Sequence, residues 1–84
     1  MLIQDNIILI TGGGRGIGNF LAMHLALVAK KVIVFDKSPE LIDQLHDIPN
    51  IEGICCDITD PEAVRDSVAE IFQKGYMVDV CINN

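Results

Sequence analysis

Three glycines near the start of the chain stand where a protein backbone can bind a phosphate group. Gly12, Gly16 and Gly18 follow the apolar run at residues 7–10 and open a stretch with helical periodicity. One glycine permits a tight turn, another lets the backbone approach a pyrophosphate, and another packs the helix against the strand. N–H groups at a helix start also attract anions. The order strand, glycine turn, helix therefore predicts a phosphate-binding loop, although such turns also form plain strand–helix connections.

An acidic residue, Asp36, ends the second apolar run of the chain, 18 residues beyond Gly18. A carboxylate at this point can accept hydrogen bonds from a ribose diol and would repel a 2′-phosphate, which favours NAD over NADP. Arg15 and Lys37 oppose this preference, since either cation can pair with a phosphate unless both remain solvated surface charges. A Walker A loop is excluded, because no Gly-Lys-Ser/Thr sequence follows the glycine turn.

The elements that must position these groups alternate between strand and helix. Strands are predicted at residues 7–10, 31–36, 51–56 and 78–82, each an apolar run bounded by turn or capping residues. Strands that alternate with helices on short connections predict an α/β fold with a parallel sheet and right-handed crossovers. The predicted order is β-α-β-α-β-α-β, in one unit without repeats or linkers.

Three helices are predicted between the strands. The first runs from about residue 16 to residue 29, where small residues at 22, 26 and 29 would permit close approach to the sheet. The second and third begin after Ser38 and Asp60, since each of these caps precedes a proline at the first helical position. The residues expected to face inward are Ile17, Phe20, Leu21, His24, Leu25 and Val28 in the first helix, Leu41, Ile42 and Leu45 in the second, and Val64, Val68, Ile71 and Phe72 in the third, which Gly75 is expected to end.

Composition narrows the classes of partner. The 84 residues carry a net charge of −6, which disfavours nucleic acid and anionic membrane, because binding there needs cationic side chains. The sequence has no apolar run long enough to span a bilayer, and its first residues lack the pattern of a signal peptide, so a cytoplasmic location is expected. Half of the residues are hydrophobic, which is rich for so small a domain and suggests apolar surface meant for another partner.

The cysteines do not form a metal-binding pattern. Cys55, Cys56 and Cys81 lie in strand-like runs, without a second CxxC-type pair or a cluster of histidines. We therefore expect no metal site and predict that the three thiols are small buried apolar groups.

The chain resembles the short-chain dehydrogenase/reductase family over essentially all of its length. The resemblance rests on four motifs in the family's order: Thr11-Gly12-Gly13-Gly14-Arg15-Gly16-Ile17-Gly18, Asp36, Asp57-Ile58-Thr59-Asp60, and Asn83-Asn84 after the last strand. It implies a Rossmann-type three-layer fold whose four parallel strands have the order 3-2-1-4, with residues 1–84 as the truncated N-terminal, NAD(P)-binding part of the domain.

The resemblance also implies which residues bind the cofactor. Those matching Gly12, Arg15, Gly16, Ile17 and Gly18 wrap its phosphates, and the one matching Asp36 binds the adenosine ribose. Asp57 and Ile58 would lie along the adenine. Asn84 would support the sheet and approach the cofactor, unless Asn83-Asn84 is an ordinary turn at a strand end.

The catalytic residues of the family have no counterpart in this chain. The family's serine and Tyr-x-x-x-Lys pair belong to a later segment, and Tyr76 has no lysine four residues on. One interpretation is therefore the cofactor-binding part of an oxidoreductase that moves hydride between nicotinamide and an alcohol or carbonyl carbon. The other is a non-catalytic module that binds an adenine nucleotide or self-associates. The family's strand order would leave a sheet face and the fourth strand uncovered, so we expect a homo-oligomer.

Overall fold

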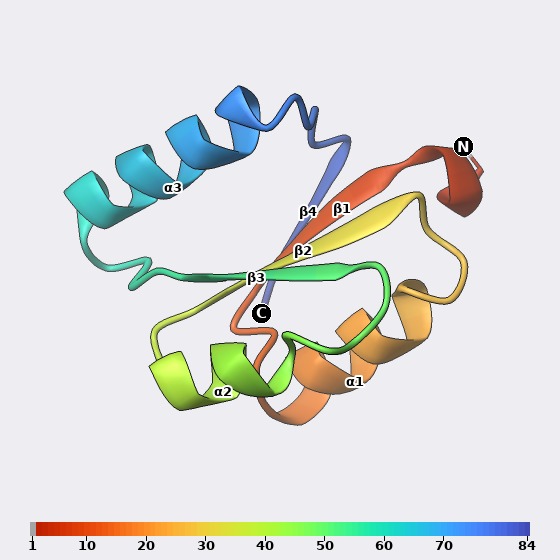
Figure 1. The fold of residues 1–84 in the computed structure, drawn as a ribbon, viewed down its shortest axis with the longest axis horizontal. Coiled ribbons are helices and arrows are strands. Elements are labelled where there is room, and N and C mark those ends of the chain that lie inside the picture. Colours follow the sequence, from red (N-terminus) through yellow and green to blue (C-terminus); the bar gives the residue numbers. More distant parts are fainter. Residues whose placement is uncertain (1) are drawn as a thin grey trace.

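A four-stranded parallel sheet forms the middle of the molecule, with helices on both of its faces (Figure 1). The computed structural model describes residues 2–84, and Met1 lies outside the described residues. The strand order β3-β2-β1-β4 confirms the predicted order. The elements, in chain order, are the 3-10 turn η1 (Ile3–Asp5), β1 (Ile7–Thr11), α1 (Gly16–Leu25), β2 (Lys31–Asp36), α2 (Pro39–Gln44), β3 (Ile51–Cys55), α3 (Pro61–Gln73) and β4 (Val80–Asn83).

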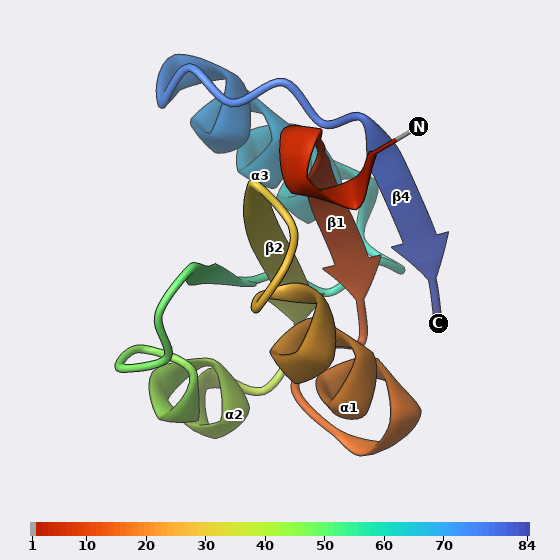
Figure 2. The same cartoon turned by 90° about the vertical axis from the view of Figure 1, so that its right-hand side faces the viewer.

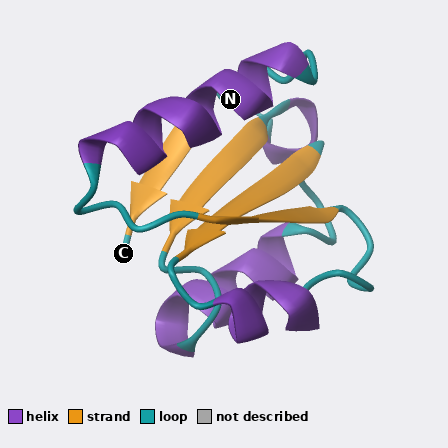
Figure 3. Cartoon of the chain, turned by 60° about the vertical axis from the view of Figure 1, so that its left-hand side comes forward, coloured by secondary structure: helices purple, strands orange, loops and turns teal. Residues whose placement is uncertain are grey.

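The helices divide the core into two layers. Helices α1 and α2 cover one face of the sheet and α3 covers the other (Figure 3). Side chains of β1 and β2 alternate between the two layers: Ile10 and Val34 face α1 and α2, whereas Leu9 and Phe35 face α3. Both strands are buried along almost their whole length, as expected for central strands of a parallel sheet. Strand β4 lies at the edge, beside β1 (Figure 2).

Helix α1 is shorter than predicted and turns a different face to the sheet. Its regular hydrogen bonding ends at Leu25, because the following turn tightens and the Asn50 amide takes the carbonyls of Ala26 and Ala29. The predicted buried face is wrong for the larger residues, which are exposed: Ile17, Phe20, His24 and Val28. Small residues pack on the sheet instead: Gly18, Ala22, Ala26 and Ala29, with Leu21 and Leu25 partly buried beside them.

Helix α3 follows its prediction at both ends and departs from it on one face. The Asp60 side chain caps the first turn, and Gly75 has a φ of 81° just after the C-cap, as a left-handed terminating glycine should. Ile71 is buried and Val64 packs against the same cluster. Val68 and Phe72 were expected inside but are exposed, because the buried stripe instead passes through Ser67.

The strands and cysteines show smaller differences. Strand β3 ends at Cys55, and β4 runs from Val80 to Asn83 rather than from residue 78 to residue 82. Cys56 is buried as predicted. Cys55 and Cys81 are exposed, because Cys55 lies on β3 and Cys81 on β4, which are the two edge strands of the sheet. Every helix within residues 2–84 is too short or too polar to cross a membrane.

Candidate functional site

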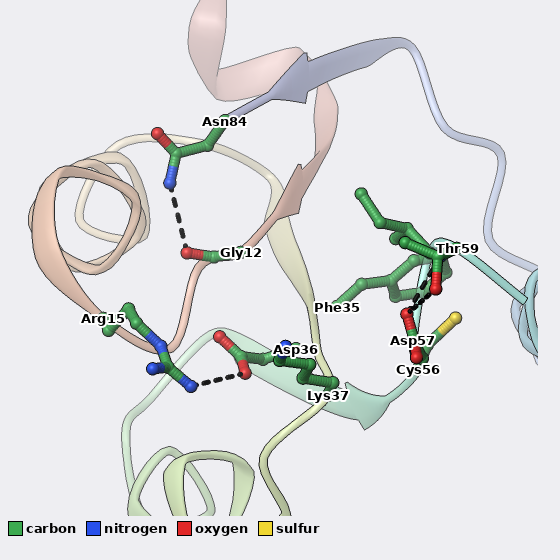
Figure 4. Close-up of a pocket in the computed structure, with 10 residues that line it drawn as sticks. Gly12, Arg15, Phe35, Asp36, Lys37, Cys56, Asp57, Thr59 and Asn84 are labelled. Atoms are coloured by element: carbon green, nitrogen blue, oxygen red, sulfur yellow. Dashed lines mark hydrogen bonds and ion pairs between the residues drawn. The ribbon is translucent and has the colours of Figure 1, made fainter.

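A pocket of about 280 Å³ lies where the parallel strands end at their carboxyl termini (Figure 4). We call it the strand-end pocket. In doubly wound α/β sheets this edge is the usual place for a ligand. The residues that line the pocket are Gly12, Arg15, Phe35, Asp36, Lys37, Cys56, Asp57, Ile58, Thr59 and Asn84.

Residues 12–15, which we call the glycine loop, join β1 to α1 and bring the two elements into close contact beside this pocket. Gly12 and Gly16 have φ values of 68° and 58°, in the left-handed region that favours glycine. A Cβ at Gly18 would overlap the carbonyl oxygen of Gly12 and lie 2.6 Å from Nδ2 of Asn84. A Cβ at Gly16 would meet no atom within 4 Å among the described residues, so the backbone here is open to approach.

The N-terminus of α1 differs from those of the other two α-helices in how it is capped. Ser38 accepts a hydrogen bond from the N–H of Leu41 in α2, and Asp60 accepts bonds from the first turn of α3. Arg15 precedes α1 and makes no side-chain cap, and the first turn of α1 contains no acidic residue. The N–H groups of this turn therefore present a positive end without a protein acceptor from a capping side chain, which suits a phosphate.

Asp36 connects the glycine loop to the end of β2. Its Oδ2 accepts a hydrogen bond of 3.1 Å from the N–H of Gly14, and its Oδ1 accepts one of 3.0 Å from the N–H of Ser38. Arg15 reaches the same Oδ1 at 3.6 Å from the solvent side. The residue is only 5% exposed, so the carboxylate is fixed in the wall of the pocket.

Asp57 forms a second acidic position at the rim, just after β3. Its Oδ1 accepts hydrogen bonds from the hydroxyl and the N–H of Thr59, at 2.7 and 2.9 Å. These two bonds, with a smaller contribution from the charge of Lys37, hold the pKa of the Asp57 carboxyl below its usual range. The side chain is exposed and remains an anion that orders the loop from residue 57 to residue 59.

The last two residues join β4 to the glycine loop. The Thr11 hydroxyl donates to Oδ1 of Asn83 at 2.9 Å and accepts a bond from the N–H of Asn84 at 3.2 Å. The side chain of Asn84 then donates to the carbonyl of Gly12 at 3.3 Å (Figure 4). Asn83-Asn84 is therefore more than a strand-end turn, because it connects the edge strand to the loop.

The structure brings most of the predicted site residues to the strand-end pocket. Six of the predicted residues line it: Gly12, Arg15, Asp36, Asp57, Ile58 and Asn84. Gly16, Ile17 and Gly18 do not line it but form the first turn of α1 beside it. Tyr76 is not part of the pocket and packs with the α3 layer, as expected, with the Lys31 ammonium 5.0 Å from its ring centre.

Four lining residues were not predicted as site residues: Phe35, Lys37, Cys56 and Thr59. Phe35 and Cys56 immediately precede Asp36 and Asp57, and their side chains point to the α3 layer at the same sheet edge. The sequence did contain a signal for Thr59, because an Asp-x-Thr sequence after a strand is typical of an Asx-turn, in which the aspartate side chain bonds the backbone two residues on.

Comparisons with known proteins identify the relatives of this chain. The family described as short chain dehydrogenase matches residues 6–84. Among curated relatives, the 3-oxoacyl-[acyl-carrier-protein] reductase of Mycobacterium avium is 36% identical over 92% of this chain and 28% of its own length. Gluconate 5-dehydrogenase of Gluconobacter oxydans is also 36% identical, over 90% of this chain and 32% of its own length. The chain thus spans about a third of the length of the curated relatives it matches.

Solved structures agree on the fold. A short chain dehydrogenase from Bacillus anthracis superposes with a TM-score of 0.87 at 22% identity, covering 98% of this chain and 35% of the other. The 2-keto-3-deoxy-D-gluconate dehydrogenase from Streptococcus agalactiae gives a TM-score of 0.83 at 28% identity, and the match covers 99% of this chain and 33% of that one.

Proposed function

Because this chain belongs to the short-chain dehydrogenase family, we propose that its strand-end pocket binds the adenosine and pyrophosphate half of a nicotinamide dinucleotide, with NAD preferred over NADP. The family uses nicotinamide cofactors of both kinds. Residues 1–84 then act as an NAD(P)-binding domain. The same proposal assigns binding roles to the residues predicted from the glycine loop, Asp36, Asp57, Ile58 and Asn84.

The residues present fit such a ligand. The uncapped first turn of α1 offers N–H donors for the pyrophosphate, and Gly16 leaves open space over that turn. Phe35, Cys56 and Ile58 supply apolar wall for a flat base, between the acidic groups of Asp36 and Asp57. The chemistry of the walls therefore changes from donor to acceptor to apolar, in the way that pyrophosphate, ribose and adenine require.

The observation that carries the preference for NAD is the fixed carboxylate of Asp36. Two backbone N–H groups hold it in the pocket wall, and it is almost fully buried. Each oxygen keeps a further lone pair for a ribose hydroxyl. A 2′-phosphate brought to this carboxylate would meet an anion that cannot move away. Arg15 opposes this effect weakly, since its side chain is largely exposed and already faces Asp36.

The activity of the whole protein is a further part of the proposal. When bound, the nicotinamide supplies hydride exchange with an alcohol or carbonyl carbon. Residues of this chain bind and orient the adenosine side of the cofactor, and we assign no catalytic residue within it. We also propose a cytoplasmic location, which the free, exposed thiols of Cys55 and Cys81 support, because such thiols persist in reducing compartments.

The site assignment is tested by following backbone amide signals during a titration with NAD. We expect the largest shifts in residues 12–18, Asp36, Asp57 and Asn84, and small shifts near His46, which lies by the start of β3, away from the strand ends. The second cavity lies around Ile42 and His46, so it serves as an internal control. Shifts confined to that cavity, or no shifts at all, would contradict the proposed site.

A second candidate function, self-association, is favoured by apolar residues that remain on the surface. Ile17, Phe20 and Leu27 on and after α1 are 73%, 62% and 82% exposed, and β4 has a free edge. We propose that these surfaces make the chain a homo-oligomer. Light scattering at tens of micromolar tests this, and a monomeric mass would contradict it. A Phe20→Gln variant should reduce the mass if α1 forms the contact, whereas Asp47→Asn should leave it unchanged.

A further inference from the structure

Gly14 stands directly behind the carboxylate that the proposed function assigns to the ribose. It does not line the strand-end pocket, but its N–H donates to Oδ2 of Asp36 at 3.1 Å. Its backbone is not in the left-handed region, in contrast to Gly12 and Gly16. An alanine would therefore be acceptable at residue 14 on conformational grounds, and space alone decides whether a side chain can be accommodated.

That space is filled on two sides. A Cβ at residue 14 would lie 2.7 Å from Oδ2 and 3.0 Å from Cγ of Asp36, and 2.9 Å from Cβ of Leu41. Leu41 cannot rotate away, because its Cβ is attached directly to the backbone of α2 and its N–H is bonded to the Ser38 hydroxyl. The Asp36 side chain is the only one of these neighbours that can turn, and turning would break its bonds to the N–H groups of Gly14 and Ser38.

We propose that Gly14 is a specificity-determining position that acts through Asp36. The absence of a side chain at residue 14 lets the carboxylate sit against the loop, where it accepts from the ribose and repels a 2′-phosphate. A methyl group there displaces the carboxylate and also separates it from Arg15, whose guanidinium lies 3.6 Å from Oδ1. The released arginine then becomes available to a phosphate. This inference rests on the proposed function and extends it to a residue that the ligand does not touch.

The test compares Gly14→Ala with the wild-type chain in calorimetric titrations of NAD and NADP. We expect the ratio of the two dissociation constants to shift toward NADP by about tenfold, because one charge-assisted hydrogen bond to the ribose is lost. Gly53→Ala is the matched control. A Cβ at Gly53 would also be crowded, at 3.1 Å from Cγ2 of Ile42. Gly53 lies in the contact between α2 and β3 and does not line the strand-end pocket, so Gly53→Ala should leave the ratio of the NAD and NADP dissociation constants at the wild-type value.

A double-mutant cycle adds a measurement that needs no ligand. Truncating Asp36 removes the carboxylate that the new methyl group would strike, so Gly14→Ala should lower the melting temperature less in an Asp36→Ala background than in the wild type. The same background should also abolish the shift in the ratio that Gly14→Ala causes alone. This cycle applies even if the single variant is too unstable to titrate.

The outcomes separate the two proposals. Wild-type preference for NAD with an unchanged ratio in folded Gly14→Ala would overturn the role of Gly14 alone. Equal effects of Gly14→Ala on melting in both backgrounds would do the same, because they would show that the methyl group does not act on Asp36. A wild-type chain that binds neither dinucleotide would overturn the proposed function, and the role of Gly14 with it.

Discussion

Replacing Gly18 by alanine should destabilise the chain by forcing α1 away from the sheet. A methyl group at this position would overlap the carbonyl of Gly12 and lie 2.6 Å from Nδ2 of Asn84. The carbonyl belongs to the backbone of the glycine turn and cannot rotate clear. Overpacking of this kind costs about 1–3 kcal/mol, and losing the bond from Asn84 to Gly12 adds about 1 kcal/mol.

The higher helix propensity of alanine partly offsets this loss of stability. Gly18 lies in the first turn of α1 without a left-handed φ, so alanine would gain up to about 1 kcal/mol of helix propensity. The net destabilisation is then about 2 kcal/mol, which corresponds to roughly 8–16 °C in melting temperature for a domain of this size. Thermal unfolding followed by far-UV circular dichroism measures it directly.

Gly16→Ala separates spatial overlap from backbone strain. A Cβ at Gly16 meets no neighbour among residues 2–84, but the φ of 58° is unfavourable for alanine by about 1 kcal/mol. We therefore expect a loss for Gly16→Ala that is about half of that for Gly18→Ala. A Gly18→Ala chain that melts at or above the wild-type temperature would refute the close approach of α1 to the turn.

Two other changes test side-chain hydrogen bonds outside the glycine turn. Asn50 has a φ of 67° and donates to the carbonyls of Ala26 and Ala29, so Asn50→Ala should lose about 2–3 kcal/mol in urea unfolding. Asn50→Gly should recover about 1 kcal/mol of this, and equal losses would contradict a conformational contribution. The pKa of Asp57 is lowered in the folded chain, so the carboxylate contributes stability above its unfolded pKa and loses that contribution as pH falls below about 4. Thr59→Val removes the hydroxyl bond and should flatten this acid-side decrease in melting temperature, whereas an unchanged pH profile would show that the Thr59 hydroxyl does not stabilise the anion.

Local sequence signals predicted the order of elements and the starts of the helices well. Ser38 and Asp60 are short polar side chains before a proline, and each caps its helix through neighbouring backbone N–H groups. Such interactions involve residues two or three apart, so no knowledge of the tertiary structure is needed. The parallel order of the strands follows from the same regular alternation, together with the family resemblance.

The orientation of α1 was not predictable from hydrophobic periodicity. The larger apolar side chains of this helix and a line of small ones both recur at helical spacing, and the sheet accepts the small ones. The deciding contact is the approach of Gly18 to Gly12, which lies in tertiary structure. The edge positions of Cys55 and Cys81 depend in the same way on strand order rather than on their own neighbours.

Sequence alone could predict that residues at the strand ends lie together, because parallel strands end at one edge of a sheet. Their roles in binding a cofactor stay a prediction. Phe35 and Cys56 escaped prediction because they are also core residues of the α3 layer. The importance of Gly14 had no sequence signal of its own. It arises from the contact between the loop and the carboxylate, 22 residues apart.

The central claim is that a buried carboxylate at the end of β2 makes this pocket a site for NAD. Calorimetric titration of the wild-type chain with NAD and with NADP, repeated on Asp36→Ala, tests it most directly. We predict that the wild type binds NAD at least about tenfold more tightly than NADP and that Asp36→Ala loses most of this difference. Tighter binding of NADP by the wild type, or an unchanged ratio in Asp36→Ala, would contradict the claim.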